Sequence, residues 1–378
     1  MNFNDSRAGL ARIGDGMLLY STGQHLHKIP GVFMTAPNQD AMAFVGQVIG
    51  HATGMMAIRL CAIGDRLDLF KTIAEKGPLT STELAAHTGL NERYLREWIY
   101  GISLAGYLDF DKSTRKVSVP EAHRPALVDV GGPLYQGGLF RMFNAILDPY
   151  QDLLRSFREG GGIDYARYNA DFWEGLEHNT CVRYKNNLVS QWLPEMPAVI
   201  AKLDAGGSFA DFGCGAGRST IEMAQRFPNA SFHGFDIFPG NIEKARVNAR
   251  EAGVADRTRF EIADFAQGVD GQFDVVATFD VIHDMADPRG GIRALRRAVK
   301  DDGIYVLMDI DCTDDPADNS GPLAVFKLGA SLHFCMTTSL AQGGEGLGTV
   351  GLPESRVREF CSAAGFASVR RLAIQHPL

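Results

Sequence analysis

Residues 209–219 read Phe-Ala-Asp-Phe-Gly-Cys-Gly-Ala-Gly-Arg-Ser, with three glycines at alternate positions. This pattern predicts a short apolar strand, a tight glycine turn and a helix that begins near Arg218. Nineteen residues after Gly217, Asp236 stands near the end of a second apolar run, residues 232–237. Glycines after a first strand let a ligand approach the backbone, and an acid after a second strand can accept hydrogen bonds from ribose hydroxyls. The layout is typical of nucleoside-binding proteins.

The spacing of the glycines indicates which nucleoside is bound. Dinucleotide enzymes use G-x-G-x-x-G, where a helix N-terminus holds a pyrophosphate. Here the pattern is D-x-G-x-G-x-G, formed by Asp211, Gly213, Gly215 and Gly217. It resembles the cofactor loop of the class I S-adenosylmethionine (SAM) methyltransferases, whose ligand has no phosphate. A tight turn that binds nothing is the alternative for this loop taken alone.

Further strands and helices alternate after this loop. Alternation of this kind implies a parallel sheet with right-handed crossovers. The resemblance covers about residues 200–378 and implies an α/β fold, a Rossmann-like domain with a mostly parallel seven-stranded sheet. The expected strands are residues 258–265, 274–281, 303–310 and 367–375, and the expected helices are residues 218–227, 240–252, 288–300 and 354–364.

The same resemblance implies a site for SAM and its product S-adenosylhomocysteine (SAH). Asp236 would hold the ribose, with Ile237 beside it. Asp264 would take the adenine amino group, with the ring of Phe265 against the base. The remaining cofactor residues expected from the resemblance are Asp211, Gly213, Cys214, Gly215 and Gly217 on the methionine side, and Phe279 at the end of the fourth strand.

The bulk composition is that of a globular protein. The 378 residues suffice for two or three domains, and 45% hydrophobic with 22% charged residues is ordinary. The net charge of -8 gives no sign of a polyanion-binding surface. Six cysteines without a C-x-x-C pair indicate reduced thiols. We find no signal peptide and no apolar run of roughly 18 residues, so we expect a cytoplasmic protein without a membrane partner.

Residues 1–40 show no periodicity and contain two proline turns. We expect an N-terminal arm that lies on another subunit or over the mouth of the active site. A disordered tail is the alternative.

Residues 41–120 predict a mainly helical domain with a wing. Thr80 and Glu83 form the capping box of a first helix, which Gly89 ends. Asn91 can cap a second helix. Two wing strands are expected at residues 106–111 and 115–120.

A winged helix raises the question of DNA binding, which depends on cations that neutralise phosphates. Residues 41–120 hold nine Lys or Arg and eight Asp or Glu, so the domain is nearly neutral. It resembles the N-terminal dimerisation domain of small-molecule O-methyltransferases and of bacterial winged-helix methyltransferases. We therefore expect a homodimer formed through this domain and no nucleic-acid partner.

Residues 121–200 predict a helical linker that caps the substrate. Ligands commonly bind between domains, outside the carboxyl ends of parallel strands. Phe172 and Trp173 would close over the cofactor, while Tyr184 and Asn187 would face the substrate. Packing of the domain junction is the alternative for each aromatic. An insertion at residues 312–352, in the catalytic domain of residues 201–378, would cap the pocket from the other side with His333.

The candidate catalytic group follows the fourth strand, where residues 279–288 read Phe-Asp-Val-Ile-His-Asp-Met-Ala-Asp-Pro. This stretch resembles the His-Asp motif of plant and animal O-methyltransferases, whose histidine is the general base. His283 falls on that histidine and Asp284 on the acid beside it. The chain departs from the motif at Met285, where those enzymes usually have tryptophan. An imidazole can accept the proton of a phenol at neutral pH, so His283 suits O-methylation.

The sequence therefore predicts a SAM-dependent methyltransferase of a small molecule. S-methylation of a thioether acid is the enzymatic alternative, because a thioether has no proton to lose. A SAM-sensing transcriptional regulator is the alternative from another class. We expect no metal: Asp280, Asp284 and Asp287 lack the pattern of magnesium-dependent catechol enzymes, and His25 and His27 are too close for zinc.

Overall fold

The structure is a computed structural model that describes residues 39–374 and residue 376. The chain forms two compact units, residues 1–56 and residues 57–378. The arm expected at residues 1–40 thus lies almost wholly outside the described residues. The described part of the first unit is the beginning of helix α1 (Gln39–Arg66), along which apolar side chains are exposed. These exposed side chains are Met42, Phe44, Val45, Val48, Ile49, Met55 and Met56.

Two helical stretches of the described residues are long and apolar enough to cross a membrane, judged by length and composition alone. They are Gln39–Arg66, with a hydropathy of 1.4, and Gly321–Ala341, with a hydropathy of 1.2. The sequence analysis expected no such stretch because it looked for an unbroken apolar run of roughly 18 residues. A mean hydropathy over a window also admits stretches with a few polar residues. The second stretch is 39% buried over its most apolar part, and the first is 6% buried.

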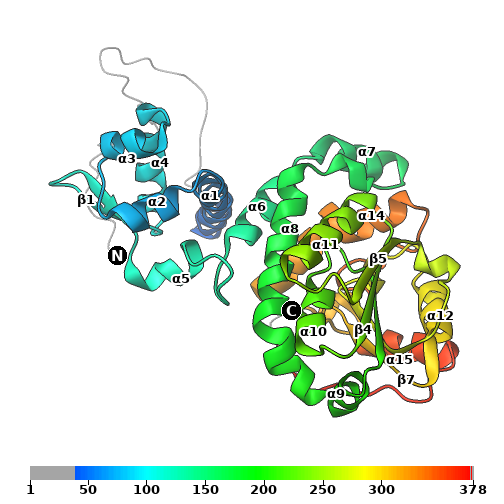
Figure 1. Ribbon diagram of the computed structural model, residues 1–378. Helices are drawn as coiled ribbons and strands as arrows, with labels where there is room; N and C mark the ends of the chain where they lie inside the picture. Colours follow the sequence, from blue (N-terminus) through cyan, green and yellow to red (C-terminus); the bar gives the residue numbers. More distant parts are fainter. Residues whose placement is uncertain (1–38, 375, 377–378) are drawn as a thin grey trace, which may run out of the picture. The chain divides into compact units, whose positions relative to one another are not determined.

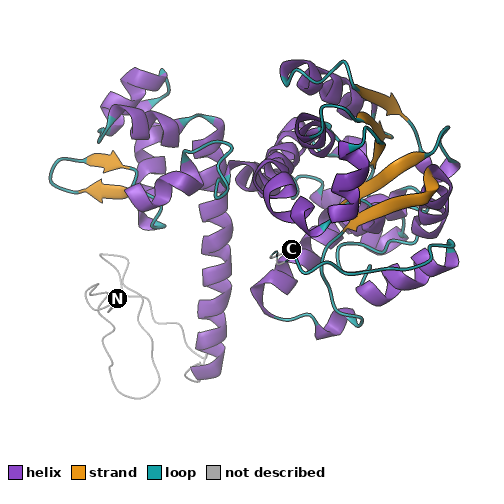
Figure 2. Ribbon diagram, turned by 60° about the horizontal axis from the view of Figure 1, so that its bottom comes forward, coloured by secondary structure: helices purple, strands orange, loops and turns teal. Residues whose placement is uncertain are grey.

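The expected winged helix is present in the second unit. Thr80 and Glu83 form the capping box, Gly89 adopts φ 72°, and the Asn91 side chain accepts from the backbone N–H of Arg93. Two short antiparallel strands form the wing (Figure 2). The elements are α2 (Leu69–Lys76), α3 (Ser81–Thr88), α4 (Glu92–Leu104), β1 (Asp109–Asp111) and β2 (Lys116–Ser118).

Helices connect the winged helix to the sheet. Among them α6 (Gly137–Ala145) and α8 (Ala170–Arg183) pack closely because glycines leave room. A Cβ on Gly138 would lie 2.7 Å from the backbone N of Asn179, and one on Gly175 would lie 2.5 Å from that of Met142. The other elements are η1 (Glu121–His123), α5 (Arg124–Leu127), α7 (Tyr150–Glu159), η2 (Tyr165–Arg167), the π-helix η3 (Tyr184–Trp192), η4 (Leu193–Glu195) and α9 (Pro197–Asp204).

A parallel five-stranded sheet forms the centre of the remaining chain (Figure 1). Its order is β5-β4-β3-β6-β7, and every neighbouring pair is parallel. The expected α/β class is confirmed. The strands are β3 (Ser208–Phe212), β4 (Ser231–Asp236), β5 (Thr258–Ile262), β6 (Phe273–Phe279) and β7 (Val299–Met308), and the crossover helices are α10 (Arg218–Arg226), α11 (Pro239–Glu251) and α12 (Pro288–Ala298).

Side chains alternate between the two faces of this sheet, as expected for buried strands. Phe209 packs in one core with α9, α10 and α11, while Ala210 packs in the other core with α12 and α15 (Glu354–Ala363). Helices therefore cover both faces, and the carboxyl ends of the strands are left to form a site.

The expectation of seven strands is wrong for the described residues, since residues 367–374 pair with no strand. Val369, Leu372 and Ile374 are partly buried and pack against the cores. These residues are therefore partly buried without backbone pairing to a neighbouring strand. Gln375 lies outside the described residues.

The insertion after β7 is helical, as expected, and is called the cap below. It consists of α13 (Gly321–Ala330), the π-helix η8 (Ser331–Cys335) and α14 (Met336–Ala341), preceded by η7 (Pro316–Asp318). The cap contacts the linker directly, because the backbone N–H of Ile163 donates to the Thr337 carbonyl at 3.1 Å. The hydroxyl of Tyr168 also donates to the His333 carbonyl.

Candidate active site

A cavity of about 650 Å³ lies at the carboxyl ends of β3, β4 and β6. The turn after β3, helix α8 and the cap supply its walls. Most of the predicted site residues line it, which brings together segments from residue 172 to residue 284. The predicted residues that line the cavity are Phe172, Trp173, Tyr184, Gly213, Cys214, Gly215, Asp236, Ile237, Asp264, Phe265, Phe279, His283 and Asp284.

The glycine turn is a backbone conformation that other residues rarely adopt. Gly213, Gly215 and Gly217 have φ values of 76°, 54° and 75°. A Cβ on Gly213 would lie 2.6 Å from a Val281 methyl group, so the close approach also requires glycine. The amides of Gly213 and Cys214 both donate to the Phe235 carbonyl, at 2.8 and 3.0 Å. The turn is therefore fixed against the end of β4.

Asp236 is held by hydrogen bonds from three sides. Its Oδ2 accepts from the Gly215 amide at 2.9 Å, and its Oδ1 accepts from the Phe238 amide at 2.8 Å and from Asn241 Nδ2 at 3.2 Å. Burial raises the pKa of this carboxyl, and the hydrogen bonds oppose the rise. The carboxylate is thus aimed into the cavity before any ligand binds. Asn241, which also lines the cavity, was missed by the sequence analysis.

Four predicted residues do not line the cavity. Asp211 is fully buried and accepts from the hydroxyls of Ser219 at 2.5 Å and Thr220 at 2.8 Å, and burial raises its pKa to about 6. It fastens the glycine turn to α10. The other three are Gly217, Asn187, which donates to the Arg183 carbonyl at 2.9 Å, and His333, whose Nδ1 lies 2.9 Å from the Gly329 carbonyl.

The aromatic wall of the cavity comes from the linker, as the sequence analysis expected. Trp173 stacks on Phe238 with ring centroids 5.9 Å apart, and Tyr184 lies 5.6 Å from Phe279. Phe172 packs against the cap residue Phe334 at 4.7 Å. Phe238 and Phe334 were not anticipated, because each lies far in sequence from its partner.

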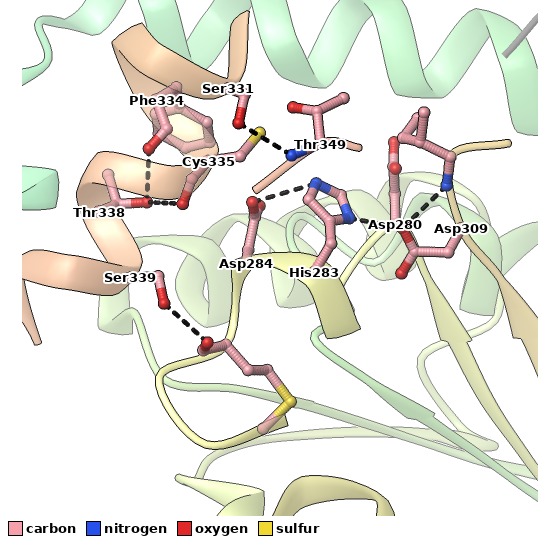
Figure 3. Close-up of polar contacts among 12 residues, drawn as sticks. Asp280, His283, Asp284, Asp309, Ser331, Phe334, Cys335, Thr338, Ser339 and Thr349 are labelled. Atoms are coloured by element: carbon pink, nitrogen blue, oxygen red, sulfur yellow. Dashed lines mark hydrogen bonds and ion pairs between the residues drawn. The ribbon is translucent and has the colours of Figure 1, made fainter. Parts of the chain in front are cut away.

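His283 stands between two carboxylates at the floor of the cavity (Figure 3). Its Nδ1 lies 2.6 Å from Asp309 Oδ1 and its Nε2 lies 3.1 Å from Asp284 Oδ1, and the imidazole is 97% buried. Burial lowers the pKa of His283, but the carboxylates of Asp284 and Asp309 outweigh burial and raise it well above its ordinary value. The two carboxylates therefore favour the protonated form of the imidazole. Asp309 was missed by the sequence analysis.

A second charged pair lies beside this trio. Asp280 has φ 67°, which is strained for a residue with a side chain, and its Oδ2 lies 3.0 Å from Arg183 Nη1. Burial raises the pKa of Asp280, but the Arg183 guanidinium outweighs burial and lowers it. Both residues line the cavity, and neither was predicted as a site residue.

Two overlapping groups of side chains could each hold a metal ion, with ligand atoms within 4.8 Å of one another. One group is His283, Asp284 and Cys335, and the other is Asp280, His283 and Asp309. Burial raises the pKa of the Cys335 thiol to about 12, so the sulfur is protonated unless a metal displaces the proton. Both ring nitrogens of His283 face carboxylates, and Arg183 pairs with Asp280 at 3.0 Å.

The chain matches two protein-family models. Residues 203–332 match a methyltransferase domain, and residues 54–128 match an Rv2258c-like winged helix-turn-helix domain. Among curated proteins, a ubiquinone biosynthesis O-methyltransferase of Pseudomonas paraeruginosa is 35% identical over 127 residues, which are 33% of this chain and 52% of that relative. The chain therefore matches about half the length of this relative.

Solved structures resemble the whole described chain at low identity. The mitomycin 7-O-methyltransferase MmcR has a TM-score of 0.61 and 20% identity, covering 87% of this chain and 94% of that one. Human N-acetylserotonin methyltransferase, solved in complex with SAM, has a TM-score of 0.61 and 19% identity, covering 88% and 94%. At such identity the likeness concerns the fold. The chain thus combines an Rv2258c-like winged helix-turn-helix domain at residues 54–128 with a methyltransferase domain at residues 203–332.

Proposed function

We propose that this protein transfers the methyl group of SAM to a small-molecule acceptor and releases SAH. The methyltransferase domain and the curated O-methyltransferase relative support this activity. The observation that carries the proposal is the position of His283, which lines the same cavity as the glycine turn and Asp236. His283, the glycine turn and Asp236 therefore face one cavity.

The cofactor residues are assigned by their chemistry. Asp236 would accept from the ribose hydroxyls, because its two oxygens are already oriented by backbone amides. Asp264 and Phe265 would hold the adenine, and the Gly213–Gly215 turn would hold the methionine part. SAM supplies an activated methyl group with its own leaving group, so the protein has to align the acceptor and to manage its proton.

For a hydroxyl acceptor, His283 would be the general base. Asp309 fixes the imidazole through Nδ1, which leaves Nε2 on the side of Asp284 to receive the proton. Only the unprotonated imidazole can act as the base, and the two carboxylates disfavour that form. Activity should therefore rise with pH, and the rise should lie above the pH of about 6.5 that an ordinary histidine gives.

S-methylation is the second candidate, and the raised pKa of His283 favours it. A raised pKa leaves less of the imidazole unprotonated at a given pH and so less of it able to act as a base, whereas a thioether acceptor needs no base. The carboxylates around His283 would also stabilise the positive charge of a sulfonium product. A pH profile without a rising limb, together with an active His283→Ala variant, would favour this candidate over O-methylation.

The first test is calorimetric titration of the protein with SAM and with SAH. Micromolar binding to the wild type, much weakened in Asp236→Ala, would support the cofactor site. Asp256→Ala is a matched control, because the side chain of Asp256 is 75% exposed and distant in sequence from the turn. Absence of binding to the wild type would mean that the glycine turn is purely structural, and the proposal would fall.

We further propose that the winged helix serves dimerisation in the cytoplasm and binds no nucleic acid. Arg93 and Arg96 of α4 lie within 4 Å of Glu97 and Glu92, at 2.5 and 3.5 Å, so neither arginine offers an unpaired charge to a phosphate. The exposed apolar side chains of α1 support a partner helix from a second copy. Sequence-specific DNA binding with a steep salt dependence would instead favour a SAM-sensing regulator.

A further inference from the structure

One cation of the cavity has no role in the proposed reaction. Lys327 lies on α13 of the cap, lines the cavity and is 92% buried. Its Nζ donates to the backbone carbonyl of Asp311 at 2.5 Å. Among the described residues, no carboxylate lies within ion-pair distance of this ammonium. A buried ammonium without a counter-charge is costly in free energy.

The other permanent cations of the cavity wall differ from Lys327 in this respect. Arg183 pairs with Asp280 at 3.0 Å, and Arg218 pairs with Glu177 at 2.7 Å. Each of these arginines therefore has an acidic partner within the protein. For Lys327, no acidic side chain of the described residues is within ion-pair distance, and Nζ has further N–H donors besides the one bound to Asp311.

The ammonium lies close to the candidate base along the chain that follows β7. Lys327 is bound to the carbonyl of Asp311, and His283 is bound to the carboxylate of Asp309. Asp309 and Asp311 are two residues apart, so their Cα atoms are separated by at most about 7 Å, and both contacts lie on one short segment of chain. Ile310, between them, also lines the cavity.

The walls next to Lys327 are apolar. Phe326, its neighbour on α13, lies with its ring centroid 4.4 Å from that of Phe143, and both rings line the cavity with Ala330. A ligand at this end therefore needs an apolar body and one negative charge. A single ammonium matches a carboxylate, whereas a phosphate monoester carries about 1.5 to 2 negative charges and would require more cations.

We propose that the methyl acceptor is a small carboxylic acid whose carboxylate pairs with Lys327 while its methyl-accepting atom lies near His283. This inference rests on the proposed methyltransferase function and narrows its substrate class. The proposal applies to a hydroxy acid and to a thioether acid alike, because Lys327 would bind the carboxylate and not the methyl-accepting atom.

The test compares acids with their neutral amides, which have nearly the same shape. Protein saturated with SAH is titrated by calorimetry with 4-hydroxybenzoate and 4-hydroxybenzamide, and with 4-(methylthio)butanoate and its amide. We expect at least one acid to bind roughly 10-fold or more tightly than its amide, as for a charged hydrogen bond. Lys327→Met should remove that difference, Lys327→Arg should preserve part of it, and the exposed control Lys71→Met should leave it intact.

The titration with SAH itself separates the two proposals. If wild-type protein binds SAH but binds acids no better than amides, or binds none of the acids, the assignment of Lys327 is overturned and the methyltransferase proposal stands. Retention of the acid preference by Lys327→Met, with normal SAH affinity as evidence of folding, also overturns it. Failure of the wild type to bind SAH would instead overturn the proposed function.

Discussion

The two ends of the cavity are built in different ways. The end that we propose to hold the cofactor, called the cofactor end, consists of short segments at the ends of β3, β4 and β5, where backbone amides and tight turns fix the geometry. The end that we propose to hold the methyl acceptor, called the acceptor end, consists of charged side chains that come from the end of β6, the end of β7 and the cap. The cofactor end comprises Gly213, Cys214, Gly215, Asp236 and Asp264, and the acceptor end comprises His283, Asp284, Asp309, Lys327 and Cys335.

Because of this difference, we expect substitutions at one end to change cofactor affinity and substitutions at the other end to change the reaction rate. At the cofactor end, hydrogen bonds from fixed amides orient Asp236, so the loss of one side chain should weaken affinity and leave the acceptor end in place. At the acceptor end, the carboxylates of Asp284 and Asp309 raise the pKa of His283. Substitutions there should change rates and pH profiles, with little effect on the affinity for SAH.

The largest effect is expected for His283→Ala. Removal of a general base typically lowers kcat by about 10²- to 10⁴-fold, and the SAH affinity should stay within a few-fold of the wild type. Single-turnover methylation with a hydroxyl acceptor measures the first quantity, and calorimetry measures the second. His333→Ala is the matched control, because His333 does not line the cavity. Equal kcat for His283→Ala and wild type would show that the accepting atom has no proton to lose.

A smaller effect is expected for Asp236→Ala. The loss of charged hydrogen bonds to ribose should cost about 1.5–3 kcal/mol, which is roughly a 10- to 150-fold rise in the Kd for SAH. At saturating SAM, kcat should remain near the wild-type value because the acceptor end is untouched. If the Asp236→Ala variant binds SAH with normal affinity, Asp236 does not contact the ribose, and the proposed contrast between the two ends of the cavity does not hold.

The next effect is a shift in pH dependence for Asp309→Asn. Because this carboxylate helps to raise the pKa of His283, its neutralisation should lower that pKa. The unprotonated base then forms at lower pH, so the rising limb of kcat/KM should move to lower pH. The exposed control Asp301→Asn, on β7, should leave the limb unchanged. If the rising limb of kcat/KM stays at the same pH in Asp309→Asn, a group other than His283 controls the pH dependence.

The smallest effect on the cavity is expected from α1. Ile49→Lys places a charge among exposed apolar side chains of this helix, where the side chain of Ile49 is 60% exposed. We expect sedimentation to show loss of a dimer, while SAH affinity stays unchanged. Gln47→Lys, on the same helix, is the matched control. A wild-type protein that is already monomeric would contradict the dimer proposal.

The sequence predicted the cofactor end well because its signals are local. Glycine spacing, a strand and a following acid lie within 30 residues and need no knowledge of the tertiary fold. Asp309 was missed although it directly follows β7, where the rule that strand ends meet at one edge could have found it. Lys327 could also have been noticed in the sequence, because it is the one charged residue in the apolar helical stretch at residues 323–340.

The errors have a physical cause as well. Residues 367–374 were expected to form a strand, yet burial of apolar side chains does not by itself produce backbone pairing. Stacking of Trp173 on Phe238 joins residues 65 positions apart, which no local pattern encodes. Contacts between segments that are distant in sequence therefore determine how the acceptor end is arranged. Such contacts cannot be predicted from a single sequence.

The junction of cap and linker bears on the engineering of this protein. A side chain at Gly162 would collide with the Thr337 carbonyl, since its Cβ would lie 1.8 Å from that oxygen, and the next residue donates a hydrogen bond to the same atom. A cap grafted from a relative would meet a linker shaped for a different partner. Exchange of acceptor preference between relatives thus requires both segments to be transplanted together, as one module.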